Sequence, residues 1–353
     1  MRLLIATDAW RPQVNGVVRT LEATIAEITR RGVTVETLTP DLFSTVPMPG
    51  YREIPLSLTT PAEVRKRIER FGPDVVHVVT EGPLGWLVRR WCMSAGLAFA
   101  SSYTTRFPEY VRARVPIPEA WSYSVLRHFH GAAAVTLVAT PRLVDELGER
   151  GFGNLRLWPR GVDTSLFAPE KATPTHFPRP VFVTASRVAV EKNIEAFLRL
   201  DLPGTKVVIG SGPSEAMLRR KYPQVHFLGR LQGVELAGAI ASADVFVFPS
   251  RTDTFGVVQL EALACGVPVA AFPVSGPLDA VGDPGVGRLD EDLRAASLAC
   301  LDLDRRACRA YALTRSWERS ADRYVAELSA IAGGQSNGVA GLEKGTAIHD
   351  ADC

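Results

Sequence analysis

The sequence predicts an α/β protein built from two doubly wound, parallel-sheet domains. Short apolar runs alternate with helical segments in residues 1–160, and the same alternation restarts at residue 181. A proline-rich linker, residues 161–180, separates the two halves, and 353 residues suffice for two ordinary domains. Because ligands bind beyond the carboxyl ends of strands in such sheets, we expect the site in a cleft between the domains.

The first half supplies five strands and their connecting helices. A threonine precedes two of the helices, at Thr60 and Thr140, and each is followed by a proline at the first helical position. This pair of residues is typical of a capped helix start. The predicted strands are 3–7, 33–38, 74–79, 97–101 and 133–138, and the predicted helices are 16–31, 61–71, 83–95, 119–130 and one that begins at 141.

The second half, residues 181–315, supplies five more strands. They are predicted at 181–185, 206–209, 225–228, 244–248 and 267–271. Beyond residue 290 the pattern is helical to about 331, and 316–331 offers Trp317, Tyr324, Val325 and Leu328 as packing residues. Residues 332–353 lack periodicity and are rich in glycine and small polar residues, so we expect a disordered tail.

Composition narrows the class of function. The formal net charge is only +2, which argues against a dedicated nucleic-acid binder. The five cysteines are scattered without a CxxC pair, as expected of reduced thiols. Asp8 interrupts the first apolar run too early for a signal peptide, and no stretch approaches the ~20 apolar residues that span a bilayer. We expect a cytoplasmic protein, with peripheral contact at the inner membrane surface left open.

The most informative segment is residues 250–262, which lies between a predicted strand and a predicted helix ended by Gly266. Asp253 and Glu261 bracket the helix start and are expected on the order of 10 Å apart. Between them, the free N–H groups near Phe255 and Gly256 attract phosphate. A ligand with a central phosphate and a hydroxyl-bearing ring at each end, such as a nucleoside diphosphate sugar, fits this pattern.

This carboxylate pair resembles that of the retaining glycosyltransferases of family four, which have the GT-B fold. The resemblance covers most of the chain. It implies two Rossmann-like domains facing a cleft and a last helix, here 316–331, that crosses back onto the first domain. The matching motifs, in order, are Gly161-Val162-Asp163 with Phe167, Ser186-Arg187 with Glu191-Lys192-Asn193, Phe227-Leu228-Gly229-Arg230, and Glu261-Ala262 with Gly266-Val267-Pro268-Val269.

The resemblance also assigns roles to residues. Arg187 and Lys192 would bind the diphosphate, Glu261 the ribose and Asp253 the donor sugar, although Asp253 is one methylene shorter than the family's usual glutamate. By position alone, Arg187 and Lys192 are equally compatible with an ordinary solvated pair. Further donor-binding residues would be Gly16 (a plain turn is the alternative), Arg230 and Leu231 near the base, and Thr254, Phe255, Gly256 and Val257.

Thr104 departs from the family pattern. Many relatives have a histidine here that meets the donor sugar, whereas a threonine hydroxyl hydrogen-bonds but cannot become cationic. Nearby, Arg106, Tyr110 and Arg112, with Arg114, are candidates for binding an anionic acceptor or a lipid headgroup. A solvated loop is an equally good interpretation of these residues.

Two further features have simpler explanations. His128 and His130 share a helix with Trp121, Val125, Leu126 and Phe129, whose spacing favours a buried stripe over membrane docking. The triplet Asp302-Leu303-Asp304 resembles the metal-binding Asp-x-Asp of other glycosyltransferases. Its position between helical segments instead predicts that Asp304 caps a helix, so we expect no metal site.

The function that follows is a retaining, metal-independent hexosyltransferase without a cofactor. The resemblance to mannosyl- and sulfoquinovosyl-transferases of the family is closest. It implies a GDP- or UDP-linked hexose of the mannose or glucose type as donor, and a lipid or saccharide hydroxyl as acceptor. Two alternatives stay open: a GT-B nucleotide-sugar epimerase, and a catalytically impaired nucleotide-sugar-binding protein, which the substitution at Thr104 would favour.

Overall fold

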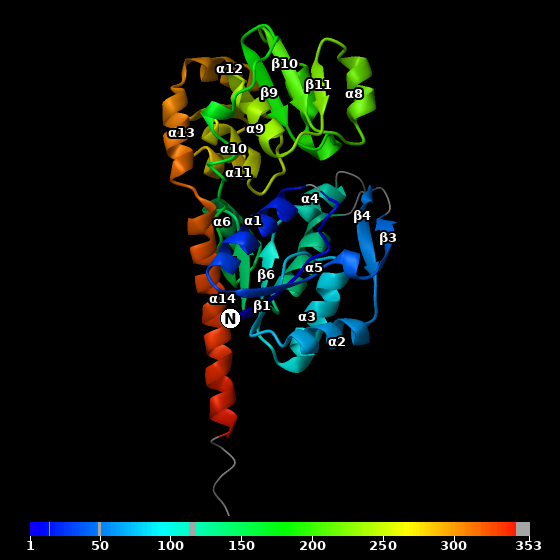
Figure 1. The fold of residues 1–353 in the computed structure, drawn as a ribbon. Coiled ribbons are helices and arrows are strands. Elements are labelled where there is room, and N and C mark those ends of the chain that lie inside the picture. The colour runs from blue at the N-terminus through cyan, green and yellow to red at the C-terminus, as the bar shows by residue number, and fades with distance from the viewer. Residues whose placement is uncertain (14, 49–50, 113–117, 344–353) are drawn as a thin grey trace, which may run out of the picture.

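Two six-stranded parallel sheets, one in each half of the chain, form the frame of the protein (Figure 1). The computed structural model describes residues 1–13, 15–48, 51–112 and 118–343. The strand orders are β2-β1-β5-β6-β7-β8 and β11-β10-β9-β12-β13-β14, with helices connecting the strands. The predicted pair of doubly wound domains is confirmed.

The first domain begins with strand β1, which lies between β2 and β5 in its sheet, and three of its helices start at residues that cap them. Asn15 Oδ1 accepts hydrogen bonds from the N–H groups of Val17 and Val18. Thr60 and Thr140 cap the helices that begin at Pro61 and Pro141, which confirms both expectations. The elements are β1 (Arg2–Ala6), α1 (Gly16–Arg30), β2 (Thr34–Leu38), η1 (Pro40–Leu42), α2 (Pro61–Phe71), β5 (Val75–Val78), α3 (Pro83–Ala95), β6 (Phe99–Tyr103), α4 (Phe107–Arg112), α5 (Glu119–His130), β7 (Val135–Val138), α6 (Pro141–Glu149) and β8 (Leu155–Leu157).

An antiparallel hairpin of β3 (Ser44–Met48) and β4 (Tyr51–Leu58) stands beside this sheet and was not predicted. Pro47 of one strand pairs with Pro55 of the other. Proline has no N–H to donate to a ladder, so prolines in a run argue against a strand. A separate two-stranded ribbon tolerates them because its strands have open edges.

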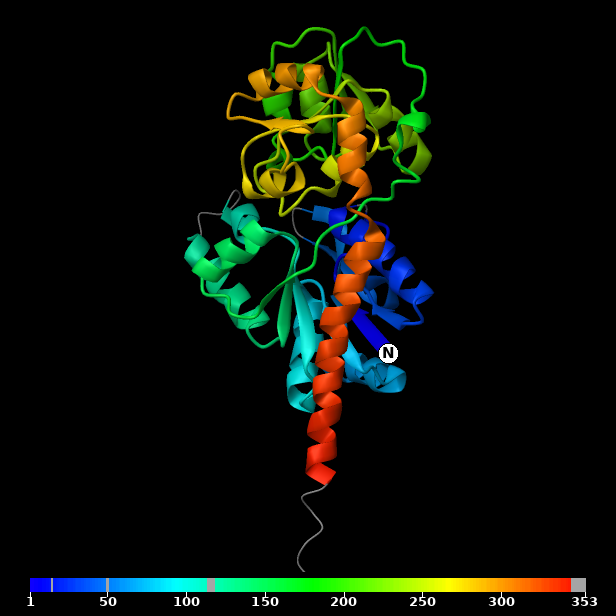
Figure 2. The same ribbon diagram turned by 90° about the vertical axis from the view of Figure 1, so that its left-hand side faces the viewer.

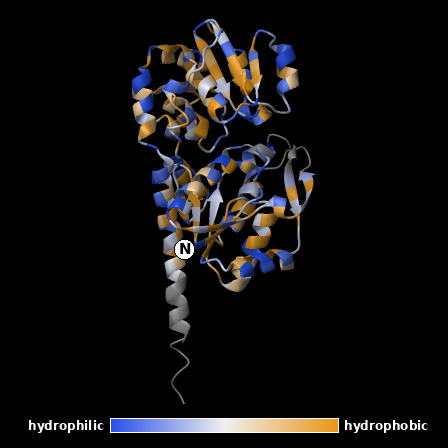
Figure 3. Ribbon diagram, viewed as in Figure 1, coloured by the Kyte–Doolittle hydropathy of each residue, from blue (hydrophilic) through white to orange (hydrophobic). Residues whose placement is uncertain are grey.

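The second domain repeats the alternation around β9. Its sheet is buried between two apolar clusters, and apolar residues are concentrated on the strands of both domains (Figure 3). The elements are η2 (Pro169–Lys171), β9 (Val181–Ala185), η3 (Val190–Lys192), α7 (Ile194–Leu198), β10 (Thr205–Ile209), α8 (Glu215–Lys221), β11 (His226–Gly229), α9 (Gly233–Ala241), β12 (Val245–Phe248), α10 (Val257–Ala264), β13 (Val269–Ala271), α11 (Ser275–Ala280), β14 (Gly287–Leu289), α12 (Leu293–Ala299), η4 (Cys300–Asp302) and α13 (Arg305–Leu313).

The last helix, α14 (Trp317–Glu343), returns along the first domain, as the resemblance implies (Figures 1 and 2). Ala321, Tyr324, Leu328 and Ile331 are buried in the same apolar cluster as Leu3 of β1. The helix continues to Glu343, whereas the sequence predicts disorder from residue 332. A helix is extended by one backbone hydrogen bond per residue, so the lack of an apolar face does not by itself end it. Residues 344–353 lie outside the described part of the chain.

The chain crosses between the domains twice, and the two crossings touch. The N–H of Val162 donates to the carbonyl of Arg315 at 3.0 Å, and Val162 forms an isolated bridge with Ser316. A Cβ at Gly161 would lie 2.5 Å from the nitrogen of Trp317, so only glycine fits at this approach. Among the described residues, no helix combines the length and apolar composition that a membrane crossing requires.

Candidate functional site

The loops that follow β6 and β12 meet at the interface between the domains. Thr254 Oγ1 donates to the main-chain carbonyl of Thr104 at 3.0 Å, which joins the two loops directly. Further contacts join the helices behind them, because Arg106 donates to Ser275 Oγ and Arg142 pairs with Asp279 at 3.4 Å. The strand ends of the two sheets therefore face each other across one interface, as the sequence predicts.

Lys192 and Asp253 form an ion pair next to Thr254, one of the residues of this interface. Lys192 ends η3, which follows β9, and its Nζ donates to Asp253 Oδ1 in the loop after β12. The side chains are only 20% and 16% exposed. The other carboxylate oxygen, Asp253 Oδ2, is buried without a hydrogen-bond partner among the described residues. A buried acceptor left in this state suits a ligand that brings hydroxyl donors.

Arg187 adds a second cation to the same loop. Its guanidinium is half-buried and lies 3.7 Å from the carboxylate of Glu191. Asn193, in a left-handed conformation with φ of 50°, donates from Nδ2 to the carbonyl of Pro249 and so holds this loop against the end of β12. Of the predicted diphosphate-binding pair, Lys192 is thus placed against Asp253, and Arg187 contacts Glu191, the neighbour of Lys192.

Helix α10 begins at this loop with its N-terminal donors uncapped by any side chain. Gly256, with φ of 82°, precedes the helix, and a Cβ there would lie 2.6 Å from the ring of Phe248. Gln259 Nε2 donates back to the carbonyl of Phe255 at 2.7 Å and so fixes the loop. The positive end of the α10 dipole therefore lies at the loop that carries Asp253, the partner of Lys192, and an uncapped helix start of this kind stabilises an anion.

Glu261 lies on α10 and is only 4% exposed. Burial raises the pKa of its carboxyl, and the guanidinium of Arg19 opposes that rise. Arg19 belongs to α1 of the first domain, and its NH1 lies 3.0 Å from Oε1 and 3.2 Å from Oε2 of Glu261. Nothing in the sequence marks Arg19, because the contact depends on how the domains meet.

Thr104, at the end of β6, is placed against the loop that carries Asp253 and Thr254. Its Oγ1 is buried and has no hydrogen-bond partner among the described residues. The hydroxyl and Asp253 Oδ2 are therefore two unsatisfied polar atoms on the two loops that this contact joins.

The candidate acceptor residues are placed differently from one another. Arg106 is buried, and its guanidinium already binds both oxygens of Glu146, at 2.6 and 2.7 Å. This pairing lies within the first domain, while the contact of Arg106 with Ser275 Oγ joins the domains, so Arg106 does not present a free cation to an acceptor. Arg112 is exposed and pairs with Glu119 at 2.8 Å. The side chain of Tyr110, and Arg114 as a whole, lie outside the described residues.

The remaining predicted donor residues differ in their surroundings: two are open and two pack against the core of the second domain. Gly16 is the first residue of α1, and a Cβ there would have no atom within 4 Å, so packing does not demand glycine. Arg230 follows β11 and is exposed, and Leu231 packs against the core of the second domain. Val257 is the first residue of α10.

Asp8, directly after β1, is a buried acid to which the sequence analysis gave no role. Its Oδ1 accepts from the N–H of Leu84 at 2.9 Å and its Oδ2 from the N–H of Gly85 at 3.2 Å, while Thr80 Oγ1 donates to Oδ2. Burial raises the pKa of the Asp8 carboxyl, against the lowering effect of these donors. Asp8 thereby anchors the start of α3 to β1. The sequence feature that could have indicated this role is a single acidic residue shortly after a buried strand.

The predicted buried stripe on α5 is wrong for two residues. Leu126 and Phe129 are buried as expected, but Trp121 is 73% exposed and Val125 is 54% exposed. The helix packs instead through the face that contains Tyr123, Leu126, Phe129 and His130. His130 is buried and contacts Ser101 and Glu81, while His128 stacks on Trp86 with ring centres 6.1 Å apart.

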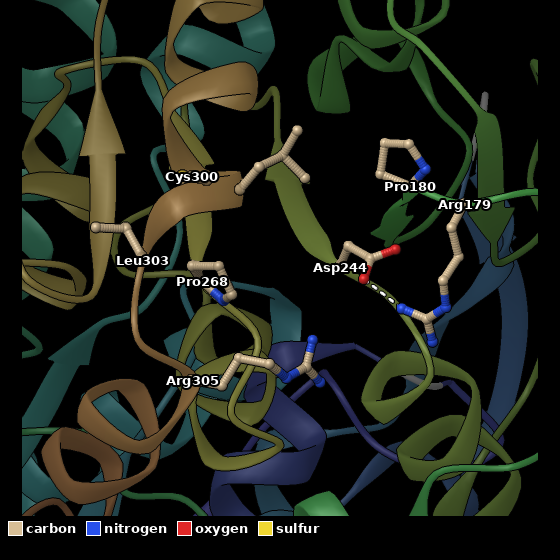
Figure 4. A pocket seen from close by; sticks show the side chains of 8 residues that line it. Arg179, Pro180, Asp244, Pro268, Cys300, Leu303 and Arg305 are labelled. Carbon is tan, nitrogen blue, oxygen red and sulfur yellow. Dashed lines mark hydrogen bonds and ion pairs between the residues drawn. The ribbon is translucent and has the colours of Figure 1, made fainter.

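Asp304 caps α13, as predicted, by accepting from the N–H of Arg306. No group of three or more His, Cys, Asp or Glu side chains within the described ranges is arranged to hold a metal. A cavity of about 420 Å³ lies elsewhere, lined by Arg179, Asp244 and Arg305 among others (Figure 4). Because Asp244 precedes β12, this cavity lies at the amino ends of the strands, at the opposite edge of the sheet from the interface.

Comparison with known proteins finds two matching family models, one for each domain. Residues 14–166 match "Glycosyltransferase Family 4", and residues 179–303 match "Glycosyl transferases group 1". Together they cover every strand of the two sheets except β1, and the interface residues Thr104, Lys192, Asp253 and Glu261.

Similar proteins cover the chain to different extents. A GDP-mannose-dependent alpha-mannosyltransferase of Mycolicibacterium smegmatis is 30% identical over 376 residues, which span 95% of this chain and 99% of that protein. The sulfoquinovosyl transferase SQD2 of Arabidopsis thaliana is 32% identical over 69% of this chain, which spans only about half (51%) of that protein. Among solved structures, Anabaena HepE in complex with UDP-glucose has a TM-score of 0.68 at 16% identity, covers 94% of this chain and shares the fold.

Proposed function

The chain belongs to glycosyltransferase family 4, and from this premise we propose that it transfers a hexose from a nucleotide diphosphate sugar to a hydroxyl acceptor with retention of configuration. The observation that carries the proposal is the largely covered Lys192–Asp253 pair in the loops before the uncapped start of α10. It combines a cation for a leaving diphosphate with a carboxylate that has an unused acceptor oxygen. Glu261, on the same helix, supplies a second carboxylate for the nucleotide.

In this proposal the diphosphate lies between Arg187, Lys192 and the N-terminus of α10. When the bond from the sugar carbon to the diphosphate breaks, its electron pair stays on the phosphate oxygen. Fixed positive groups at that point stabilise the developing charge without reorganising, which is the effect of an oxyanion hole. They provide the charge that a divalent metal would otherwise supply, so we propose that the transfer needs no metal and no other cofactor.

The sugar would contact Asp253 and Thr104. Asp253 Oδ2 accepts a hydroxyl hydrogen, and Thr104 Oγ1 both donates and accepts. Because both atoms are buried and unsatisfied among the described residues, a hexose hydroxyl between them relieves two unpaired groups at once. A mannose or glucose donor linked to GDP or UDP fits this role. GDP-mannose is the first to test, because the Mycolicibacterium relative is named as dependent on it.

The acceptor would be a lipid or saccharide hydroxyl approaching from the first domain. The exposed Trp121 and Val125 on α5 favour peripheral contact with a membrane, since aromatic and apolar side chains enter the interfacial region. Arg112 and Arg127 are exposed nearby in sequence and add positive charge for anionic headgroups. A nucleotide-sugar epimerase or an inactive binding protein is not favoured, because the similar curated proteins named above are transferases.

The test is an assay of the purified chain with radiolabelled GDP-mannose and UDP-glucose, with and without total lipid extract. Product is expected only when an acceptor is present, and Asp253→Asn is expected to abolish most of it. Asp302→Asn is the matched control, because Asp302 is an exposed acid remote from the interface loops. Free or epimerised sugar formed equally well without acceptor would contradict transferase function.

A further inference from the structure

Arg19 connects the first domain to a carboxylate buried in the second. It lies on α1, one turn after Gly16, and reaches Glu261 with a single guanidinium nitrogen, NH1. The Arg19 side chain is 33% exposed, whereas that of Glu261 is nearly covered. Among the described residues, Glu261 has no other charged partner within ion-pair distance.

The neighbours of α10 do not replace this cation. Arg305 and Arg309 of α13 direct their guanidinium groups to main-chain carbonyls. Asp279 of α11 pairs with Arg142, and Glu235 of α9 is exposed. The thiol of Cys265 stays neutral because burial raises its pKa to about 12. Among these residues, Arg19 is therefore the group that opposes the rise in the pKa of the buried Glu261 carboxyl and favours its ionised form.

A carboxylate has about four lone-pair sites that accept hydrogen bonds. The NH1 nitrogen of Arg19 carries two N–H bonds, so it can fill at most two of these sites. Glu261 therefore retains acceptor capacity for two hydroxyl donors while Arg19 stays in place. A protonated carboxyl would lose much of that capacity, and the usual state of an unpaired buried carboxyl is the protonated one. The two vicinal hydroxyls of a ribose match the two acceptor sites that remain on the Glu261 carboxylate.

We propose that Arg19 is a positioning residue for the nucleotide half of the donor, which holds Glu261 oriented and ionised only when the two domains are together. The inference rests on the proposed function. It makes nucleotide affinity depend on domain closure, because the residue that prepares the ribose site belongs to the opposite domain. Arg19 is not displaced by the ribose but remains bound beside it.

The test is titration calorimetry of GDP and UDP with the full chain, Arg19→Gln, Arg19→Lys and the control Arg30→Gln. Arg30 lies on the same helix and pairs with Glu27 within it. Arg19→Gln is expected to weaken nucleotide binding about tenfold or more at pH 6, the usual consequence of losing a charge-assisted contact. Arg19→Lys keeps the charge and is expected to stay within about threefold, and Arg30→Gln is expected to bind like the wild type.

The pH profile separates a positioning role from a structural one. Without Arg19, Glu261 is protonated at low pH and ionises as the pH rises. The ratio of wild-type to Arg19→Gln affinity should therefore fall between pH 6 and pH 8.5, while the ratio for Arg30→Gln stays flat. Because wild type and variant are compared at the same pH, the effect of the nucleotide's own titration on affinity cancels in the ratio. In a Glu261→Gln background, Arg19→Gln should cause no further loss.

Each outcome decides between explanations. Wild-type-like or tighter binding by Arg19→Gln would overturn the inference, and tighter binding would mean that Arg19 competes with the ribose. A loss that is the same at every pH, or one accompanied by an equal loss in Arg19→Lys, would also overturn it. Failure of the wild-type chain to bind either nucleotide would instead overturn the proposed function, and this inference with it.

Discussion

Replacing Lys192 by alanine is the sharpest test of the diphosphate site. The substitution removes one cation of the proposed leaving-group site and leaves Asp253 without its ion-pair partner. The fold should tolerate it, because Lys192 ends a short 3-10 turn on the surface of the interface and no apolar core residue is changed. The expected effect is therefore on the rate of transfer and not on the amount of folded protein.

The size of the effect follows from the exposure of the site. Two unit charges 4 Å apart interact by about 1 kcal/mol in water and about 4 kcal/mol at an effective dielectric constant near 20. Because the Lys192 side chain is mostly covered, a value of about 2 to 4 kcal/mol is appropriate. At 1.36 kcal/mol per factor of ten, kcat/KM should fall roughly 30- to 1000-fold.

Initial rates of sugar transfer to acceptor, measured over a range of donor concentrations, test this value. Lys221→Ala is the matched control, since Lys221 is exposed and pairs with Glu195 of α7 within the second domain. Circular dichroism and thermal melting of both variants should match the wild type. Turnover by Lys192→Ala within a few fold of the wild type would refute the placement of the diphosphate.

Three further predictions concern other parts of the chain. Thr104→His introduces a titratable ring beside Asp253 and should change donor preference or rate without unfolding the protein; an unchanged donor profile and rate would place Thr104 outside the donor site. Transfer should persist in excess chelator, and rescue of a chelator-inactivated enzyme by manganese would contradict the metal-free mechanism. The double variant Asp302→Ala and Asp304→Ala should keep turnover within about threefold of the wild type. Its free energy of unfolding should fall by about 1 kcal/mol, because α13 loses its cap. Tyr324→Phe removes the hydroxyl that bonds buried His77 at 2.7 Å; calorimetry should show unfolding easier by about 1–3 kcal/mol, and an unchanged melting temperature would count against this contact.

The strands and capped helices could be predicted because their signals are local. A parallel strand buried on both faces is a continuous apolar run, as in residues 245–248, and a threonine-proline pair marks a helix start wherever it occurs. The family motifs likewise place Lys192 and Asp253 on loops at adjacent strand ends. Parallel strands bring these loops together whatever the details of packing.

The features that were not predicted depend on packing between distant segments. In the sequence, Arg19 is an ordinary helical residue, and only the packing of α1 against α10 brings it to Glu261. Arg106 is likewise predicted as an exposed loop cation, whereas in the fold it is buried and paired with Glu146. Similarly, helical spacing identifies an apolar stripe on α5 but cannot say that Trp121 and Val125 remain outside the packed face. The sequence therefore locates the site but not the contacts that close it.

The return of α14 has a consequence for biosynthesis. The residues of this helix that complete the core of the first domain, including Tyr324 and Leu328, leave the ribosome after the whole second domain has been made. At about 5–20 residues per second, the first domain waits roughly 10 to 30 seconds with that apolar surface uncovered. Nascent chains are therefore most prone to aggregation and to capture by chaperones in this interval. If residues 1–160 were expressed alone, α14 would be missing and this apolar surface would stay uncovered.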